Sequence, residues 1–116
     1  MKLKKLSEIE IRPYPSDKAK NATGRVAIGK ADGAENYCMR LMEVHEDGNT
    51  AMHSHDFEHE VFVHCGKGKV FGNGEWSDIQ PGDVVFIPAN ETHQFKCVGE
   101  EPLLFVCVIP SGPPEL

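Results

Sequence analysis

The sequence predicts an all-β domain, either a sandwich or a barrel. Turn signals made of glycine, asparagine, aspartate and proline recur at short intervals along the chain. The segments between these turns are rich in Val, Ile, Phe and Tyr, which favour extended backbone. Short strands separated by regularly spaced turns are typical of β-sandwiches and β-barrels.

Eight segments are expected to be strands because apolar and β-branched residues gather in them. In chain order they are Arg25–Ile28, Tyr37–Val44, Glu60–His64, Gly68–Phe71, Glu75–Ile79, Val84–Ile87, His93–Cys97 and Leu103–Ile109. The turn Gly72-Asn73-Gly74 predicts a tight hairpin, since glycine and asparagine readily adopt positive φ. No stretch has a helical period, and Leu3–Ile11 fits either a short helix or an arm strand.

Length and charge narrow the classes of function. The 116 residues suit one domain, and the net charge of −6 argues against a nucleic-acid partner. No apolar run approaches the roughly 18 residues that span a bilayer. The basic start Met1–Lys5 is not followed by an apolar segment, so no secretion signal is expected. We therefore expect a cytoplasmic protein whose four cysteines, none of them in a CxxC pair, are reduced.

The chain divides into three expected regions. Residues 37–110 form the barrel, residues 1–36 form an arm and first strands that pack on the barrel or a partner subunit, and residues 111–116 form a loose tail. Leu103–Ile109 is apolar at every position, which suggests that both faces of this strand are covered. A second subunit would provide that cover, and two-fold dimers are the commonest oligomers, so a homodimer is expected.

A histidine cluster is the strongest chemical signal. Because side chains alternate faces along a strand, His53 and His55 project to the same side. If the extended register continues, His59 joins them and Glu60 points away. His93 opens a later strand and is the natural fourth member. Imidazole is the commonest metal ligand in proteins, so the pattern predicts a metal site.

The two remaining histidines fit this pattern less well. His45 precedes a turn, and His64 lies on the face opposite His59 by parity. Both are interpreted as surface residues or as neighbours of the ligands.

With these residues, the chain resembles the cupin superfamily. Its first motif, G(X)5HXH(X)3–4E(X)6G, corresponds to Gly48–Gly66, and its second, G(X)5PXG(X)2H(X)3N, corresponds to Gly82–Cys97. The resemblance spans about residues 37–109 and is closest to small single-domain cupins with four histidines. It implies one small antiparallel β-barrel of the double-stranded β-helix, or jelly-roll, type.

Three departures from the motifs affect the site. Four residues, not five, separate Gly48 from His53, Asn90 replaces a glycine and Cys97 replaces an asparagine. Asparagine tolerates positive φ, so the turn at Asn90 should survive. The family's acidic ligand maps to Glu60 or is replaced by His59. Parity and the spacing to Gly66 favour His59, and Glu60 is the alternative because a β-bulge would reverse the register.

A four-histidine site favours particular chemistry. Four neutral imidazoles leave the +2 charge of a divalent ion uncompensated, which favours anions such as an enolate, a carboxylate or peroxide. The resemblance implies manganese or iron most often, with nickel, zinc or copper as ions that isolated material can carry. Histidines must be neutral to bind metal, so affinity is expected to fall below about pH 6.5.

Other side chains are candidates for contacts with a substrate. Arg40 either points to solvent or binds a substrate carboxylate bidentately. Phe105 and Cys107 share a parity and either line a pocket or pack in the core, while Glu60 and His64 are candidate bases. The sequence thus predicts an oxygenase-like metalloenzyme for a small oxygen-rich or unsaturated molecule. The alternatives are a binding or sensing barrel without turnover, and a Lewis-acid isomerase or lyase.

Overall fold

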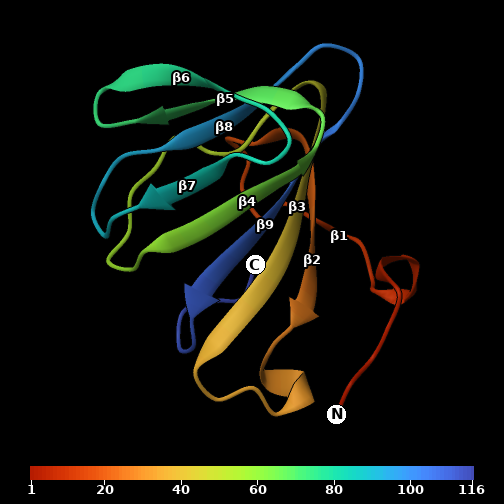
Figure 1. Ribbon diagram of the computed structural model, residues 1–116. Helices are drawn as coiled ribbons and strands as arrows, with labels where there is room; N and C mark the ends of the chain where they lie inside the picture. The colour runs from red at the N-terminus through yellow and green to blue at the C-terminus, as the bar shows by residue number, and fades with distance from the viewer.

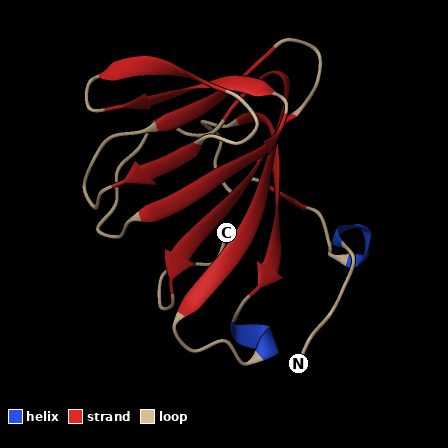
Figure 2. Cartoon of the chain, viewed as in Figure 1, coloured by secondary structure: helices blue, strands red, loops and turns tan.

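The computed structural model describes residues 1–116 and consists almost entirely of β-strands. Its elements are η1 (Leu6–Glu8), β1 (Arg12–Pro13), β2 (Lys20–Ile28), η2 (Lys30–Asp32), β3 (Tyr37–Asn49), β4 (His59–Cys65), β5 (Lys67–Gly72), β6 (Glu75–Ile79), β7 (Val84–Ile87), β8 (Gln94–Val98) and β9 (Leu103–Pro110). The only helical pieces are the two 3-10 turns, coloured blue in Figure 2. No helix in the structure could span a membrane.

The strands form one curled antiparallel sheet. Its order is β6-β5-β8-β3-β9-β4-β7, with β2 also paired to β3 and β1 paired to β2. In Figure 1, β5, β6 and β8 lie above the fan formed by β7, β4, β9, β3 and β2, so the sheet curls over on itself. The predicted fold class, a small antiparallel β-barrel in one domain, is confirmed.

The core fills the space inside this curl. Strand β9 lies between β3 and β4, and its residues alternate between buried and half-buried. Phe105 of β9 stacks on Phe95 of β8, with ring centroids 4.3 Å apart. Since β8 and β9 belong to opposite parts of the curled sheet, this aromatic pair joins the two parts through apolar contact.

Two strand boundaries differ from the prediction by more than one residue, and the two-residue strand β1 was not predicted. Strand β2 begins at Lys20 instead of Arg25, and β3 continues through the expected turn at Asp47 to Asn49. Asp47 does adopt a positive φ of 60°, but the local result is a register shift opposite Asn21, as in a β-bulge. In both places, backbone pairing with the neighbouring strand keeps a polar segment extended although its sequence has no alternation of apolar residues.

The two flanking segments both return to the barrel. Leu3–Ile11 is neither a helix nor a strand along its length but contains the short turn η1. Arg25 Nη1 donates to the Leu6 carbonyl at 2.7 Å, which ties this arm to β2. Residues 111–116, expected to be loosely held, make specific contacts: Leu116 packs against the core, and Glu115 Oε2 accepts from the Lys30 amide at 2.8 Å.

The outer face of β9 is partly covered. Leu103, Phe105, Cys107 and Ile109 are buried, whereas the alternate residues are half-buried. Leu3 and Leu6 of the arm line a groove together with Val106. The unbroken apolar pattern of β9 thus corresponds to a buried inner face and an outer face that the arm covers in part.

We expect Gly66→Ala to destabilise the fold more than Gly74→Ala. Both glycines have positive φ, 75° and 77°, so each alanine costs about 1–2 kcal/mol of backbone strain. A methyl group at residue 66 would also collide with the Pro102 carbonyl, whereas residue 74 has open space. Unfolding in urea measures both losses, and equal losses would contradict the steric account.

Candidate metal centre

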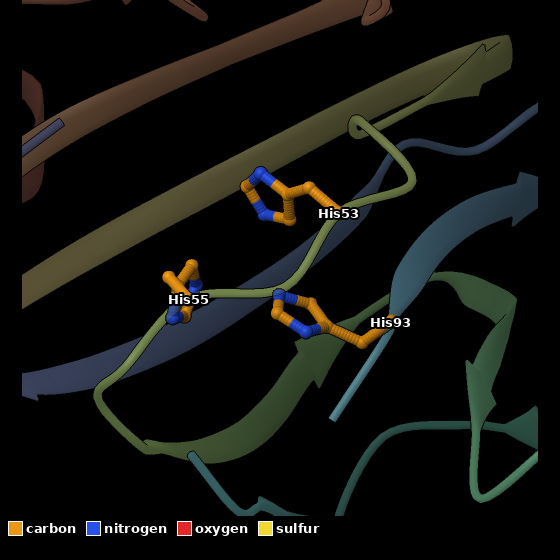
Figure 3. A group of neighbouring side chains, drawn as sticks. All are labelled: His53, His55 and His93. Carbon is orange, nitrogen blue, oxygen red and sulfur yellow. The ribbon is translucent and has the colours of Figure 1, made fainter. Parts of the chain in front are cut away.

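Three histidines meet where a loop crosses the start of β8. The His53 amide donates to the His93 carbonyl at 3.2 Å, and the His93 amide donates to the His53 carbonyl at 2.9 Å. This isolated bridge holds the chain before His55 in extended form. Figure 3 shows the rings of His53, His55 and His93 gathered around one space, and their ligand atoms all lie within 4.8 Å of one another.

His59 is the fourth member of this cluster. It is the first residue of β4, its side chain is 6% exposed, and its Nε2 lies 2.7 Å from Nε2 of His55. Its ring also meets that of His93 edge-on, with centroids 4.9 Å apart. Glu60, the alternative ligand, is exposed on the opposite face of β4, where it pairs with Phe86 of β7. The structure therefore brings the four predicted histidines together and leaves Glu60 outside.

The spacing of these nitrogens fits a divalent ion. Metal–imidazole bonds of about 2.0–2.1 Å place adjacent ligand nitrogens about 3 Å apart and opposite ones about 4 Å apart. Nε2 of His59 lies 2.7 Å from Nε2 of His55, and the ligand atoms of His53, His55 and His93 lie within 4.8 Å of one another, so the observed separations are close to these values. The donor set accordingly fits a metal ion with only small side-chain movements.

Main-chain carbonyls orient two of the rings. His55 Nδ1 lies 3.0 Å from the Phe57 carbonyl, and His93 Nδ1 lies 2.9 Å from the Glu91 carbonyl. A carbonyl can only accept, so Nδ1 carries the proton in each ring and Nε2 keeps its lone pair. Both lone pairs are therefore available for a cation at the centre of the cluster.

Burial also keeps these imidazoles neutral. Loss of solvent, followed by repulsion from neighbouring histidines, lowers the pKa of His53 from 6.5 to about 4. Loss of solvent and then the Arg40 guanidinium lower the pKa of His59 to about 2, and the pKa values of His55 and His93 are lowered too, mainly by burial. For free histidine, protons would begin to compete with a metal ion at about pH 6.5. Because these pKa values are lowered, the competition should begin at a lower pH.

The cluster opens into a cavity of about 370 Å³ inside the barrel. Most of its remaining wall is apolar or aromatic and comes from six parts of the chain. These residues are Tyr14, Pro15, Met42, Phe57, Phe95, Phe105, Pro114 and Leu116. Only Phe105 among them was a candidate from the sequence. Tyr14, Pro114 and Leu116 carry no local signal, because they reach the cavity from segments far from the histidines in the chain.

Arg40 and Cys107 also line the cavity. Arg40 points inward, with Nη2 2.9 Å from Cys107 Sγ and 3.1 Å from His59 Nδ1. Of the two orientations open for Arg40, the structure has the inward one. Phe105 and Cys107 combine both of their predicted roles, since they are 2% and 3% exposed, belong to the core and border the cavity.

The other two histidines lie away from the cavity. His45 Nε2 is 4.0 Å from a carboxylate oxygen of Glu43, and His64 is exposed on the outer groove beside the N-terminal arm. Neither contributes to the cluster.

The depressed pKa values give a testable dependence of stability on pH. Between about pH 6.5 and about pH 4, unfolded His53 binds a proton that folded His53 does not bind. In the presence of a chelator, the free energy of unfolding should therefore fall as pH falls through this window. His53→Asn should show a shallower fall in urea-unfolding series, and the exposed-site control His64→Asn should follow the wild type. Parallel curves for wild type and His53→Asn would contradict the assignment.

Comparison with known proteins agrees with this geometry. The family model described as "Cupin domain" matches residues 40–109. The polyketide cyclase RemF from Streptomyces resistomycificus superposes with a TM-score of 0.92 at 30% identity, covering 98% of this chain and 82% of that chain. A predicted oxalate decarboxylase from Thermotoga maritima shares the fold, with a TM-score of 0.82, 24% identity, and coverage of 94% and 98%.

Curated relatives match over shorter stretches. The 1-methylthio-D-xylulose 5-phosphate methylsulfurylase of Rhodospirillum rubrum is 31% identical over 71 residues, which is 61% of this chain and 46% of that protein. The glucose-6-phosphate isomerase of Pyrococcus furiosus is 33% identical over 58 residues, covering 45% of this chain and 31% of that protein. The chain thus spans less than half the length of these relatives. With the family model matching more than half of its residues, the chain belongs to the cupin family.

Proposed function

We propose that this protein is a metal-dependent cupin enzyme acting on a small, unsaturated molecule that carries oxygen donors. The observation that carries the proposal is the convergence of four neutral imidazoles on the wall of a cavity of about 370 Å³. His53, His55, His59 and His93 would hold the ion, manganese or iron by the family resemblance. A bound ion would supply Lewis-acid or redox chemistry.

The walls of the cavity favour apolar substrates. Phe57, Phe95 and Phe105 supply aromatic surface, and Arg40 is the one lysine or arginine in the lining. A sugar phosphate, the kind of substrate named for the isomerase relatives, presents many hydroxyl groups and a dianion that this lining would leave largely unpaired. A flat, mostly apolar molecule with one anionic oxygen group matches the lining better.

Arg40 is suited to attract that anionic group. Its Nε is buried without a hydrogen-bond partner, which lowers stability, so the side chain's placement is better explained by function than by folding. Its guanidinium lies beside the proposed ligand His59 at 3.1 Å. An enolate or carboxylate oxygen near the histidines would therefore meet a second positive group. Phe105 serves as wall, and Glu60 faces away from the cavity.

Two reaction classes fit this site. The predicted oxygenase-like reaction suits an unsaturated substrate bound beside a redox-active ion. The alternative is Lewis-acid catalysis without oxygen, and the similarity to a polyketide cyclase at 30% identity supports it. Polyketides contain repeated carbonyl groups whose enolates chelate metal ions, so both classes share an enolisable 1,3-diketone as the simplest substrate model.

We further propose that the protein forms a homodimer through the outer face of β4, β7 and β9. Val84, Phe86 and Phe62 are 77%, 59% and 46% exposed, and Phe62 pairs with both Val84 and Val106 in register. The patch continues the groove beneath the N-terminal arm, which also includes Val106. Exposed apolar side chains gathered on one face, here beside Glu60, are typical of interaction sites.

Elemental analysis of protein purified without added metal tests the site. We expect near-stoichiometric manganese or iron in the wild type, loss of metal in His59→Ala, and retention in Glu60→Ala, because His59 faces the cavity and Glu60 does not. Loss in Glu60→Ala with retention in His59→Ala would reverse the ligand assignment.

The same preparations test the chemistry with 2,4-pentanedione, a small 1,3-diketone. Ultraviolet difference spectra measure binding of the enolate. The wild type should bind it, and His59→Ala should bind it at least tenfold more weakly. Oxygen uptake with diketone consumption supports an oxygenase, and consumption without oxygen supports Lewis-acid catalysis. Binding without consumption supports a binding barrel, and a wild type that neither holds metal nor binds diketone rules out the proposal.

Light scattering after size exclusion tests the dimer. Phe62→Lys should convert a dimer into a monomer, because each copy would place a charge in the apolar interface. Val98→Lys, at a similarly exposed residue on β8 outside this face, should leave the mass unchanged. A monomeric wild type, or a Phe62→Lys variant that remains dimeric, would contradict the proposed interface.

A further inference from the structure

Arg40, His59 and Cys107 form a closed triangle of contacts behind the histidine cluster. Cys107 Sγ lies 3.0 Å from His59 Nδ1 and 2.9 Å from Arg40 Nη2, and Arg40 Nη2 lies 3.1 Å from His59 Nδ1. The three side chains come from the neighbouring strands β3, β4 and β9, where Arg40 and Cys107 are directly paired in register. His59 and Cys107 are 6% and 3% exposed, so these contacts are shielded from solvent.

The chemistry of the three side chains determines which of them can donate and which can accept each hydrogen bond. A guanidinium nitrogen can only donate, and an imidazole nitrogen donates when it carries the proton and accepts when it does not. Cys107 sulfur can accept through its lone pairs. Among the groups that contact His59 Nδ1, Cys107 Sγ is therefore the one that can accept a proton from it.

Two proton arrangements for His59 follow, and they exclude each other. If Arg40 Nη2 donates to Nδ1, then Nε2 carries the ring proton and offers no lone pair to the cluster. If Nδ1 carries the proton and donates to Cys107 Sγ, then Nε2 is free to act as a ligand. Since Nε2 is the nitrogen that faces His55 at 2.7 Å, the second arrangement is the one that completes the four-nitrogen set.

In His55 and His93, main-chain carbonyls fix the position of the ring proton. Their Nδ1 atoms meet the carbonyls of Phe57 and Glu91, at 3.0 Å and 2.9 Å. His59 has no such carbonyl contact and meets a sulfur in the corresponding place. A side chain thus performs for His59 the task that backbone oxygens perform for the other two rings.

We propose that Cys107 is a positioning residue: its Sγ accepts the His59 Nδ1 proton and so fixes the tautomer that presents Nε2 to a metal, while Arg40 Nη2 donates to the same sulfur and holds it in place. This role rests on the proposed metal site and requires no ionisation of the thiol. Outer partners of this kind typically change metal affinity by about 10–100-fold when removed.

Zinc affinity of purified protein, measured by competition with a chromogenic chelator, tests the role. Cys107→Ala removes the acceptor and should weaken zinc binding by about 10–100-fold. Cys107→Ser retains an acceptor and should recover most of that loss. Cys38→Ala is the matched control, since Cys38 is a buried cysteine of β3, 1% exposed, with no hydrogen bond to a histidine, and the variant should bind zinc like the wild type.

Long-range proton–nitrogen NMR of zinc-loaded, histidine-labelled protein measures the tautomer directly, with His59 assigned by comparison with His59→Gln. The wild type should carry the His59 proton on Nδ1. A wild-type proton on Nε2, or a Cys107→Ala variant with wild-type affinity and an unchanged tautomer, would overturn the role of Cys107. A wild type that binds no zinc would instead overturn the metal site on which the role rests.

Discussion

The backbone bridge between His53 and His93 is the contact on which the candidate site depends. These residues lie far apart in the sequence, and each amide donates to the other's carbonyl. The bridge fastens the loop that follows β3 to the start of β8, and it thereby joins the two parts of the curled sheet beside the cavity. With the backbone fixed there, His55 follows two residues after His53, and a short segment that bends at Asp56 and Phe57 brings His59 to the same centre.

Strand β9 provides the second constraint. It lies between β3 and β4, so its register decides which side chains of three strands meet inside the barrel. Arg40 of β3 and Cys107 of β9 are one pair set by this register, and Cys107 contacts His59 of β4. A shift of one residue in this strand would turn Cys107 outward and replace the sulfur with an aliphatic side chain. Packing of the core and orientation of the proposed ligand thus depend on the same pairing.

Sequence reasoning succeeded where the controlling chemistry is local. Strands β6 and β7 match the expected ranges, because the turns at Gly72-Asn73-Gly74 and Pro81-Gly82, with positive φ at Asn73, Gly74 and Gly82, separate these strands from their neighbours. Alternation of side chains in extended chain explains why His53 and His55 share a side, but the backbone bends at Asp56 and Phe57, so His59 reaches the cluster through a bend that parity did not predict. The start of β2 at Lys20 was missed, because that polar segment is extended only through its pairing with β3.

The remainder of the site depends on contacts between distant segments. Arg40 had two orientations open in the sequence, and its meeting with Cys107 is set by the pairing of β3 with β9. Tyr14 and Leu116 border the cavity without any motif that marks them. The proposed ligands could therefore be predicted from spacing, whereas most of the surrounding wall could not.

The wall of the cavity and the framework that carries the histidines come largely from different segments of the chain. The histidines and the core belong to the paired strands and the bridge, but Tyr14, Pro15, Pro114 and Leu116 belong to segments that lie against the barrel without forming it. Replacements in these segments can reshape the cavity while the sheet and the histidine cluster keep their geometry. Substrate choice can in this way diverge among related barrels without cost to the framework that holds the proposed metal ligands.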